Sequence, residues 1–414
     1  MRLLHTSDWH LGQTLHQFDR SHEHDRFLAW LADTLVAERV DALLIAGDIF
    51  DGSNPPASAQ ARFYQFLSEA RRRVPGIDIV IAAGNHDSPG RLEAPAPLLA
   101  LFGATVVGAV AGCAAPDLER LVVPLHGADG GIKAWCIAMP FLRPGDVPRV
   151  DGADHPYPAG IEALYRAAFE LAQSRRQSGQ AIVALGHCHL TGGQLSEDSE
   201  RSIAIGGAEM LSASTFDAAI AYVALGHLHL AQCVGRDETR RYSGSPLPLS
   251  FSEIDYPHQV VVVDLDGAAV GEIRALRVPR SVELLRIPDR PAPIEQALAE
   301  LAALTLPDRP PSQWPYLQLR VQLTQPEPGL RAQVDAAIEG LPLRLARIET
   351  SYLAPPTDEN APTLSIDDLA ARSPADFFDR LYRHRFGDAA PAELMAAFAE
   401  LLNAPAATES EFES

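Results

Sequence analysis

The sequence predicts an α/β protein built as a layered β-sandwich flanked by helices. Over the first 275 residues, short apolar runs alternate with segments of helical spacing, as expected of an α/β layered fold. Four runs, at residues 40–46, 77–83, 181–185 and 221–225, have the pattern of buried strands, and a glycine and a polar residue follow each. Ligands bind at the carboxyl ends of strands in open α/β sheets, so these polar residues are candidates for a functional site.

The segments between the first strands carry one-sided apolar patterns. Phe27, Leu31 and Leu35 recur at helical spacing, and a second stripe runs through residues 63–67. We interpret the aromatic side chains of both segments as core residues of helices that cover a sheet. Residues 1–275 are therefore predicted to form one domain, which is large enough to bury a substantial core.

A second, smaller α+β domain is predicted at residues 281–351. Its pattern is strand, helix, strand, helix, strand, at residues 282–287, 293–304, 316–323, 330–338 and 343–348. This region has no cluster of metal-ligand residue types, so we interpret it as a domain that caps the site and positions the substrate. Residues 354–363 form a polar, proline-containing stretch that we predict to be a linker.

The C-terminal region is predicted to be a helical hairpin at residues 364–403, followed by an acidic, disordered tail at 404–414. Ser373, Pro374 and Asp376 form a helix-start pattern, and apolar side chains then recur on one side of each helix. A hairpin this apolar cannot bury its own face. Two interpretations remain open: the hairpin folds back on the catalytic domain, or it docks onto a helix of a partner.

The overall charge weighs against a protein that grips DNA by itself. The formal net charge is −20 and the pI is about 5.1. Proteins that bind duplex DNA usually present a basic surface. Bound divalent cations would offset carboxylates at the site, and a partner subunit could supply basic surface elsewhere.

The sequence also indicates the compartment. A strand pattern at residues 1–5 leaves no room for a leader peptide, and no apolar run approaches the length of a membrane span. Cys113, Cys136, Cys188 and Cys233 lack CxxC spacing, which argues against a zinc ribbon or a disulfide framework. We therefore expect a cytoplasmic protein with free thiols and no membrane partner.

Five short motifs offer metal ligands in chain order. They are DxH (Asp8, His10), GDxxD (Asp48, Asp51), GNHD (Asn85, His86, Asp87), GH (His187) and GHxH (His227, His229). Because side chains at i and i+2 of a strand point the same way, Asp8 and His10 could reach the same ion, and so could His227 and His229. A lone buried histidine is usually a hydrogen-bonded core residue and DxH alone is weak, but five such motifs in order at strand ends favour a metal site.

The donor types narrow the choice of metal. Carboxylate, imidazole and amide oxygen without thiolate suit manganese, iron or zinc, and several imidazoles disfavour magnesium. Two-metal hydrolytic sites hold their ions roughly 3.5–4 Å apart, usually through a shared carboxylate. Asp48, the acid at the tip of a central strand, is the natural bridging residue.

The ordered motifs resemble the calcineurin-like metallophosphoesterase superfamily. Longer stretches, at residues 5–12, 47–51, 224–229 and 242–253, are similar to the SbcD family of nuclease subunits. The last stretch, YSGSPLPLSFSE, is not typical of other phosphoesterases. The resemblance covers the first 275 residues well, the second domain by its layout, and the terminal hairpin only loosely.

The resemblance implies roles for individual residues. It places a first metal ion on Asp8, His10, Asp48 and His229, and a second on Asp48, Asn85, His187 and His227. It makes His86 a catalytic histidine that binds no metal, and it gives His189 no ligand role. Asp51 and Asp87 are candidates either for orienting these side chains or for plain structural capping.

The resemblance also implies a function. A chain of this kind would be a DNA nuclease with two divalent ions, manganese being favoured, and with 3′–5′ exonuclease and hairpin-directed endonuclease activity. It would act in DNA end processing, repair and recombination as a homodimer within a heterotetramer that contains an SbcC-type ATPase. Two alternatives stay open: a phosphatase or cyclic-nucleotide phosphodiesterase of the same superfamily, and a non-catalytic binding platform.

Overall fold

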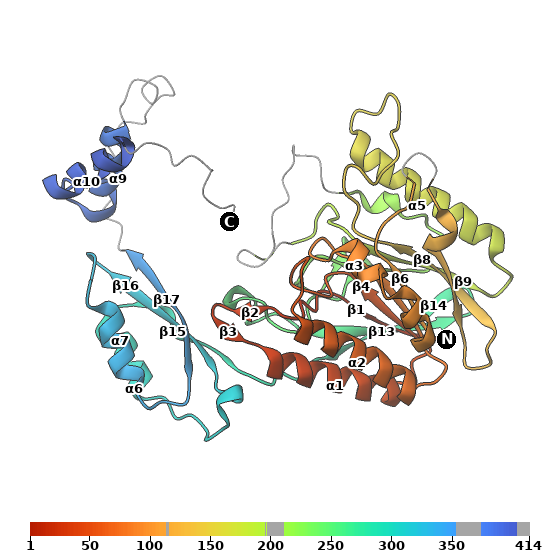
Figure 1. Ribbon diagram of the computed structural model, residues 1–414, viewed down its shortest axis with the longest axis horizontal. Coiled ribbons are helices and arrows are strands. Elements are labelled where there is room, and N and C mark those ends of the chain that lie inside the picture. Colours follow the sequence, from red (N-terminus) through yellow and green to blue (C-terminus); the bar gives the residue numbers. More distant parts are fainter. Residues whose placement is uncertain (113–115, 195, 197–210, 353–373, 404–414) are drawn as a thin grey trace, which may run out of the picture. The chain divides into compact units, whose positions relative to one another are not determined.

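A computed structural model describes residues 1–112, 116–194, 196, 211–352 and 374–403 (Figure 1). These residues form two compact units. The first comprises Met1–Leu284 and Ser312–Trp314, and the second comprises Leu285–Pro311 and the described residues after Trp314. The predicted α/β class is confirmed, whereas the predicted linker at 354–363 and the predicted tail at 404–414 lie outside the described residues.

Two six-stranded sheets form the centre of the first unit. The strands of the first sheet are β1 (Arg2–Thr6), β4 (Ala42–Ala46), β5 (Asp78–Ala82), β6 (Ala104–Val107), β13 (Gln259–Asp266) and β14 (Ala269–Arg277). The strands of the second sheet are β7 (Val122–His126), β8 (Ile132–Met139), β9 (Ala181–His187), β10 (Tyr222–Gly226), β11 (Gln232–Val234) and β12 (Asp237–Tyr242).

The strand orders are β14-β13-β1-β4-β5-β6 and β11-β12-β10-β9-β8-β7. Neighbours from β1 to β6 in the first sheet are parallel, as are β8, β9, β10 and β12 in the second. Strand β4 contacts β9 and β10, so the central strands of the two sheets lie against each other. The carboxyl ends of these strands are therefore brought to a common edge.

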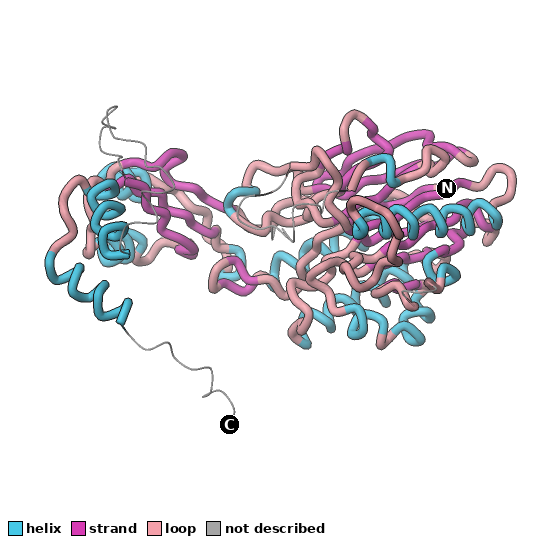
Figure 2. Tube along the Cα trace, turned by 90° about the horizontal axis from the view of Figure 1, so that it is seen from above, coloured by secondary structure: helices cyan, strands magenta, loops and turns pink. Residues whose placement is uncertain are grey.

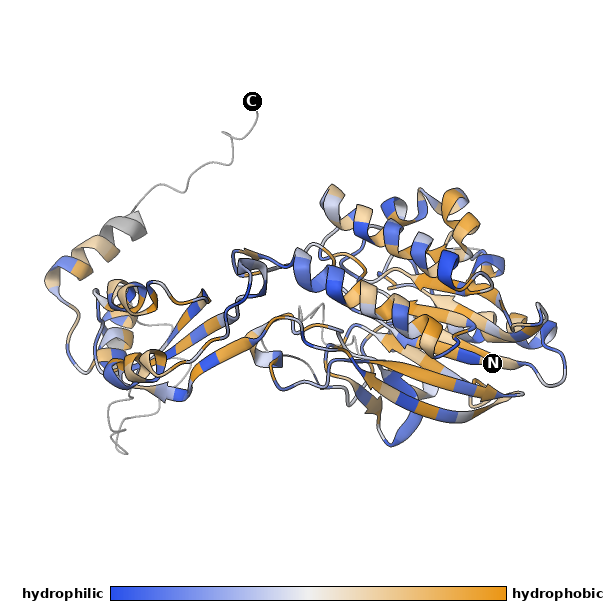
Figure 3. Ribbon diagram, turned by 90° about the horizontal axis from the view of Figure 1, so that it is seen from below, coloured by the Kyte–Doolittle hydropathy of each residue, from blue (hydrophilic) through white to orange (hydrophobic). Residues whose placement is uncertain are grey.

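Alternation along the strands explains the layering of the first unit. Leu4, Leu43 and Ile45 belong to one apolar cluster, whereas Leu3 and Leu44, pointing to the other face, belong to a second cluster shared with the other sheet. The runs are continuously apolar because both faces of these strands are covered. Figure 3 shows strands of the first unit largely in the colour of hydrophobic residues.

Helices cover the outer faces of the sandwich (Figure 2). On the first sheet lie α1 (Ser21–Ala37) and α2 (Ala57–Arg73), whose Phe27, Leu31 and Phe63 are buried in its cluster, as predicted. On the second sheet lies α5 (Pro156–Arg175). Smaller elements of this unit are β2 (Thr14–Leu15), β3 (Phe18–Asp19), α3 (Pro89–Glu93), α4 (Ala96–Leu99) and short 3-10 helices that include Phe251–Glu253.

The second unit has a three-stranded sheet in the order β15-β16-β17. Its elements are β15 (Leu284–Ala292), α6 (Ile294–Ala302), β16 (Tyr316–Leu323), α7 (Leu330–Ile338) and β17 (Arg344–Tyr352). The order of elements matches the prediction, but β15 runs five residues past the predicted end at 287 and includes Pro288 and Pro291. Prolines interrupt a central strand but are tolerated at an edge, which is where β15 lies.

Two helices, α9 (Pro374–Phe386) and α10 (Ala392–Asn403), lie in the segment predicted as a hairpin at 364–403, of which residues 364–373 are outside the described part. Phe378 and Phe398 stack between them with ring centroids 4.3 Å apart. Phe377 and Leu381 on α9 remain 40% and 65% exposed, and Leu394 on α10 remains 39% exposed. The hairpin therefore has an internal contact but leaves these three apolar side chains partly exposed.

Burial gives one histidine of the sandwich a strong preference for its neutral form. His5 lies on β1, is fully buried, and reaches β10 through its ring. Its Nε2 lies 3.1 Å from the Leu225 carbonyl oxygen and its Nδ1 lies 2.9 Å from the Tyr222 hydroxyl. A carbonyl can only accept, so Nε2 carries the hydrogen and the hydroxyl donates to Nδ1. Burial lowers the pKa of His5 from 6.5 to about 3.

We expect this histidine to make the protein sensitive to acid. Between pH 6.5 and about 3 the unfolded chain binds a proton on His5 that the folded chain does not. The contribution of neutral, buried His5 to the free energy of unfolding is therefore full above pH 6.5 and is lost as the pH falls. Over two pH units that loss is on the order of 2–3 kcal/mol. Urea denaturation in chelator at pH 6.5 and 4.5 should show a smaller loss for His5→Gln than for the wild type. Equal losses would contradict the assignment.

Candidate metal centre

The predicted site residues lie at or just after the carboxyl ends of parallel strands of the two sheets. Asp8 and His10 come after β1, Asp48 and Asp51 after β4, residues 85–87 after β5, His227 and His229 after β10, and His187 is the last residue of β9. Because β1, β4 and β5 belong to one sheet and β9 and β10 to the other, the site lies at the edge where the carboxyl ends of strands from both sheets meet. Each sheet supplies part of the site residues.

The backbone at these positions is strained. Six non-glycine residues of the described chain have positive φ, and four are predicted ligands: Asp8 (54°), His10 (45°), Asp48 (49°) and His227 (105°). Such conformations cost of order 1–3 kcal/mol each and collect at functional sites. Asp8 and His10 therefore reach the site through turns beyond the strand end, and not through the strand alternation used to predict it.

Glycines before the ligands allow the loops to approach closely. A Cβ on Gly84 would collide with the carboxylate and backbone nitrogen of Asp48, and a Cβ on Gly47 would collide with the His187 ring. Gly47 also has a φ of 84°, which favours glycine. The glycine in the GD and GN motifs is thus explained by packing at the site.

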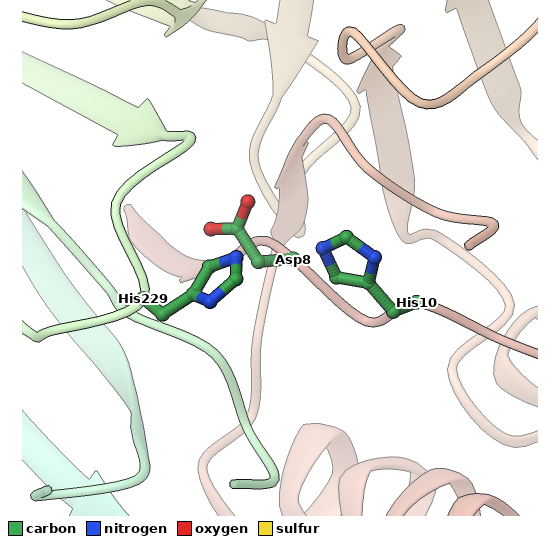
Figure 4. Close-up of side chains that lie close together, drawn as sticks. All are labelled: Asp8, His10 and His229. Carbon is green, nitrogen blue, oxygen red and sulfur yellow. The ribbon is translucent and has the colours of Figure 1, made fainter. Parts of the chain in front are cut away.

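The first cluster joins Asp8, His10 and His229, whose ligand atoms lie within 4.8 Å of one another (Figure 4). All three residues are buried. Asp48 approaches the same place, with Oδ2 3.7 Å from His10 Nε2. That Nε2 is buried and has no hydrogen-bond partner among the described residues, which is costly unless a ligand occupies the nitrogen.

The second cluster also includes Asp48. The Oδ2 of Asp48 is 3.4 Å from His187 Nε2, and the ligand atoms of Asp8, Asp48 and His187 lie within 4.8 Å of one another. The side-chain oxygen of Asn85 lies 2.9 Å from His187 Nε2 and 3.0 Å from His227 Nδ1. Asp48 is thus within reach of both clusters, and one carboxylate oxygen faces an imidazole of each.

Hydrogen bonds fix the orientation of three of the imidazoles. The Nδ1 of His187 donates to the Ala46 carbonyl at 2.8 Å, and the Nδ1 of His10 lies 3.2 Å from Asp51 Oδ1. The Nδ1 of His229 lies 2.8 Å from Glu253 Oε1. In each case an acceptor holds Nδ1–H, so Nε2 is the nitrogen that can bind a metal once it carries no proton, the usual arrangement for a metal ligand.

Glu253 was not among the predicted site residues. It ends the YSGSPLPLSFSE stretch and is fully buried, so the sequence alone shows only an acid near serines and a phenylalanine. Its contact with His229 spans 24 residues of sequence, and no local pattern marks it.

The remaining predicted residues surround Asp48. His86 is partly buried; its backbone N–H donates to Asp48 Oδ1 at 2.9 Å and its Nδ1 to the Asp51 carbonyl at 2.8 Å. The ring of His86 lies 4.8 Å from that of His10. Asp87 accepts from the backbone N–H groups of Ile49, Phe50 and Gly84, so its carboxylate ties the loop after β4 to the loop after β5.

Charge in the site is balanced inside the protein. Burial opposes ionisation of Asp48, but the imidazoles of His187 and His10 hold the pKa of Asp48 well below its usual range. Burial likewise disfavours charge on His187, yet the Asp48 carboxylate raises the pKa of His187 to about 9. Burial raises the pKa of Asp8. Two buried carboxylates close together are a place where cations stabilise the fold.

Divalent metals fit this donor set. Carboxylate and amide oxygens alternate with imidazole nitrogens, no thiolate is present in the clusters, and one buried nitrogen lacks a protein partner in the described structure. The first ion would be held by Asp8, His10, Asp48 and His229, and the second by Asp48, Asn85, His187 and His227. His189 lies outside both clusters, with its ring 6.2 Å from that of His227. These ligand assignments stay predictions.

Comparison with known proteins decides the family. Residues 1–231 match the calcineurin-like phosphoesterase family, and residues 280–386 match the family described as type 5 capsule protein repressor C-terminal domain. The SbcD subunit of nuclease SbcCD from Rhodobacter capsulatus is 43% identical over 371 residues, which is 86% of this chain and 91% of that protein. The chain belongs to the SbcD family.

A second SbcD relative supports the same conclusion. The corresponding nuclease SbcCD chain of Escherichia coli (strain K12) is 32% identical over 387 residues, covering 90% of this chain and 92% of that protein. A dimetal phosphatase from Danio rerio is 12% identical with a TM-score of 0.35 over 68% of this chain and 99% of its own, a likeness too weak to carry an argument. The resemblance to the SbcD family, noted from the motifs, is thereby confirmed.

Two further expectations concern membranes and cysteines. In the described part of this SbcD-family chain, no helix is long and apolar enough to cross a bilayer. Cys136, Cys188 and Cys233 are free thiols, and Cys113 lies outside the described residues.

Proposed function

We propose that this chain is the metal-dependent nuclease subunit of an SbcC–SbcD-type complex and that it hydrolyses phosphodiesters of DNA. The observation that carries the proposal is that Asp48, in a member of the SbcD family, lies within reach of two clusters of oxygen and nitrogen donors. Two divalent ions, manganese being the metal we favour, would activate water and neutralise charge on the phosphate.

The protein's own groups have separate tasks in this scheme. Asp48 holds both clusters together, and its second oxygen fixes the backbone of His86. Because the Asp51 carbonyl accepts from Nδ1 of His86, the other ring nitrogen is the one that gains or loses the proton. We assign His86 to hydrogen-bond the phosphate and to protonate the leaving 3′ oxygen.

Digestion of end-labelled DNA with manganese, with and without an added SbcC-type ATPase, tests the proposal. We expect metal-dependent loss of the labelled end in the 3′–5′ direction and cutting near hairpins, as the family resemblance implies. Phosphomonoesters and cyclic nucleotides should be poor substrates under the same conditions. Preferred cleavage of either would support the phosphatase or cyclic-nucleotide alternative, and absence of any turnover with bound metal would support a binding platform.

We propose that the hairpin of α9 and α10 docks the ATPase subunit. Phe377 and Leu381 lie one helical turn apart on α9 and are exposed, and Leu394 is exposed on α10. Exposed apolar side chains on a helix are of the kind that packs against a partner helix. The name of the relatives, which makes them one subunit of nuclease SbcCD, refers to an assembly with a second subunit. We further propose that two copies of each subunit form a heterotetramer, in which the partner supplies basic surface that offsets the net charge of −20 of this chain.

Deletion of all residues after Ala354 should separate docking from chemistry. The clusters lie wholly within the first unit, so we expect near-normal hydrolysis of bis-p-nitrophenyl phosphate and no binding to the ATPase in a pull-down. Leu381→Ser should weaken binding in the full chain, whereas Val36→Ser, at an exposed apolar position on α1, should not. A collapse of small-substrate turnover in the deleted chain would place the hairpin in the catalytic fold instead.

A further inference from the structure

Glu253 is a buried carboxylate to which the proposed chemistry assigns no task. It has 0% exposure, and a buried charge needs hydrogen-bond donors to offset the water it gives up. Its two oxygens have different donors. Oε2 accepts from the backbone N–H of Leu249 at 2.8 Å, and Oε1 lies 2.8 Å from Nδ1 of His229.

The segment that carries Glu253 is anchored independently of this carboxylate. The buried Arg20 donates to the Pro248 carbonyl at 2.7 Å, and Gln13 donates to the Leu249 carbonyl at 2.8 Å. The backbone just before Glu253 is therefore fixed by side chains of Arg20 and Gln13, and this places the Glu253 carboxylate beside His229. A pre-positioned acceptor fixes a ring more strongly than a mobile one.

The geometry determines which nitrogen of His229 faces the metal. An ionised carboxylate only accepts, so the hydrogen of the neutral ring must lie on Nδ1 and the lone pair on Nε2. The second cluster differs, since the Nδ1 of His187 donates to the neutral carbonyl of Ala46. Hydrogen bonds to a charged acceptor are roughly twice as strong as neutral ones, so the carboxylate of Glu253 holds the Nδ1–H of His229 more firmly than the Ala46 carbonyl holds that of His187.

We propose that Glu253 is a positioning residue that holds His229 in its metal-binding tautomer and makes the first cation position the tighter of the two. His10 adds to the same asymmetry, because its Nδ1 also faces a carboxylate, that of Asp51. The inference deepens the proposed function and rests on it: the two ions load in order, and the first position fills at lower metal concentration.

Glu253→Gln is the informative substitution because it keeps shape and removes charge. Glutamine has one accepting oxygen and one donating nitrogen. Whichever way the amide is turned, one of its two contacts places a donor against a donor: against the Leu249 N–H or against the His229 Nδ1–H. The ring can relieve the second conflict by moving its hydrogen to Nε2, and that tautomer cannot bind a metal through Nε2.

Calorimetric titration of the metal-free full-length chain with manganese tests the proposal. The wild type should bind two ions with unequal affinity. Glu253→Gln should weaken the tighter step roughly 10–100-fold, as loss of a ligand's hydrogen-bond partner typically does, and leave the weaker step unchanged. Ring ¹⁵N spectra of histidine-labelled, metal-free protein should show the hydrogen of His229 on Nδ1 in the wild type. In the variant they should show a mixture of the Nδ1–H and Nε2–H tautomers.

His258→Gln is the matched control. His258 contacts the carbonyls of Ser245 and Glu253 at 2.9 and 3.1 Å, so its loss loosens the same segment without touching a ligand. We expect its metal affinities to stay within about threefold of the wild type. Equal weakening in both variants, equal weakening of both steps in Glu253→Gln, or an unchanged His229 tautomer would overturn the role of Glu253. A wild type that binds no metal would overturn the proposed function itself.

Discussion

Replacing Asp48 by asparagine should remove both metal ions from the chain. Asp48 Oδ2 lies 3.4 Å from His187 Nε2 and 3.7 Å from His10 Nε2, so the same oxygen serves both clusters. An amide keeps the shape but lacks the charge that offsets two divalent ions. We expect cleavage to fall by at least roughly 10³-fold, because metal activation of water and charge neutralisation contribute several kcal/mol to the transition state.

Elemental analysis after gel filtration measures this effect directly. The wild type should retain two ions per chain, and Asp48→Asn should retain fewer than one at the same protein concentration. Asp78→Asn is the matched control, because Asp78 begins β5 at the end remote from the site and its carboxylate accepts from the backbone N–H of His126. It should keep the metal content of the wild type. Retention of both ions in Asp48→Asn would show that Asp48 is not the shared ligand.

Much of the fold could be predicted because the central strands have both faces covered. Residues 42–46 and 78–82 are apolar runs, interrupted only by Asp78 at the start of the second, and a glycine with a polar residue follows each carboxyl end. Such strands can lie only between packed layers, which restricts the chain to an α/β sandwich. The ligand motifs were recognisable for the same reason, since polar groups directly after buried strands are costly without a function.

The remaining features depend on contacts between distant parts of the chain. The positive φ of Asp8 and Asp48 could not be predicted locally: aspartate tolerates this conformation better than most residues, but most aspartates do not adopt it, and here the surrounding site compensates its cost. Glu253 likewise looks like an ordinary acid until His229 is placed beside it. The extension of β15 through Pro288 is possible because β15 lies at the edge of its sheet. The sequence of a single segment does not reveal whether its strand is central or at an edge.

His86→Ala should lose turnover while it keeps both metals. The ring of His86 contacts the Asp51 carbonyl and lies beside the ring of His10, but it is not part of the clusters that contain Asp8 or Asp48 side chains. Loss of a general acid reduces the rate roughly 10²–10⁴-fold. Turnover of a DNA oligonucleotide and metal content, measured on the same preparation, should therefore separate in this variant.

The leaving group distinguishes an acid from a residue that only orients the phosphate. A p-nitrophenolate leaving group needs little protonation. The turnover rate of His86→Ala should therefore fall much less on a p-nitrophenyl ester of a nucleotide than it falls on DNA, each relative to the wild type. An equal loss on both substrates would assign His86 to phosphate binding alone. Loss of metal in the variant would instead make His86 a ligand, in which case its nearness to His10 and Asp51 would describe part of the first metal position.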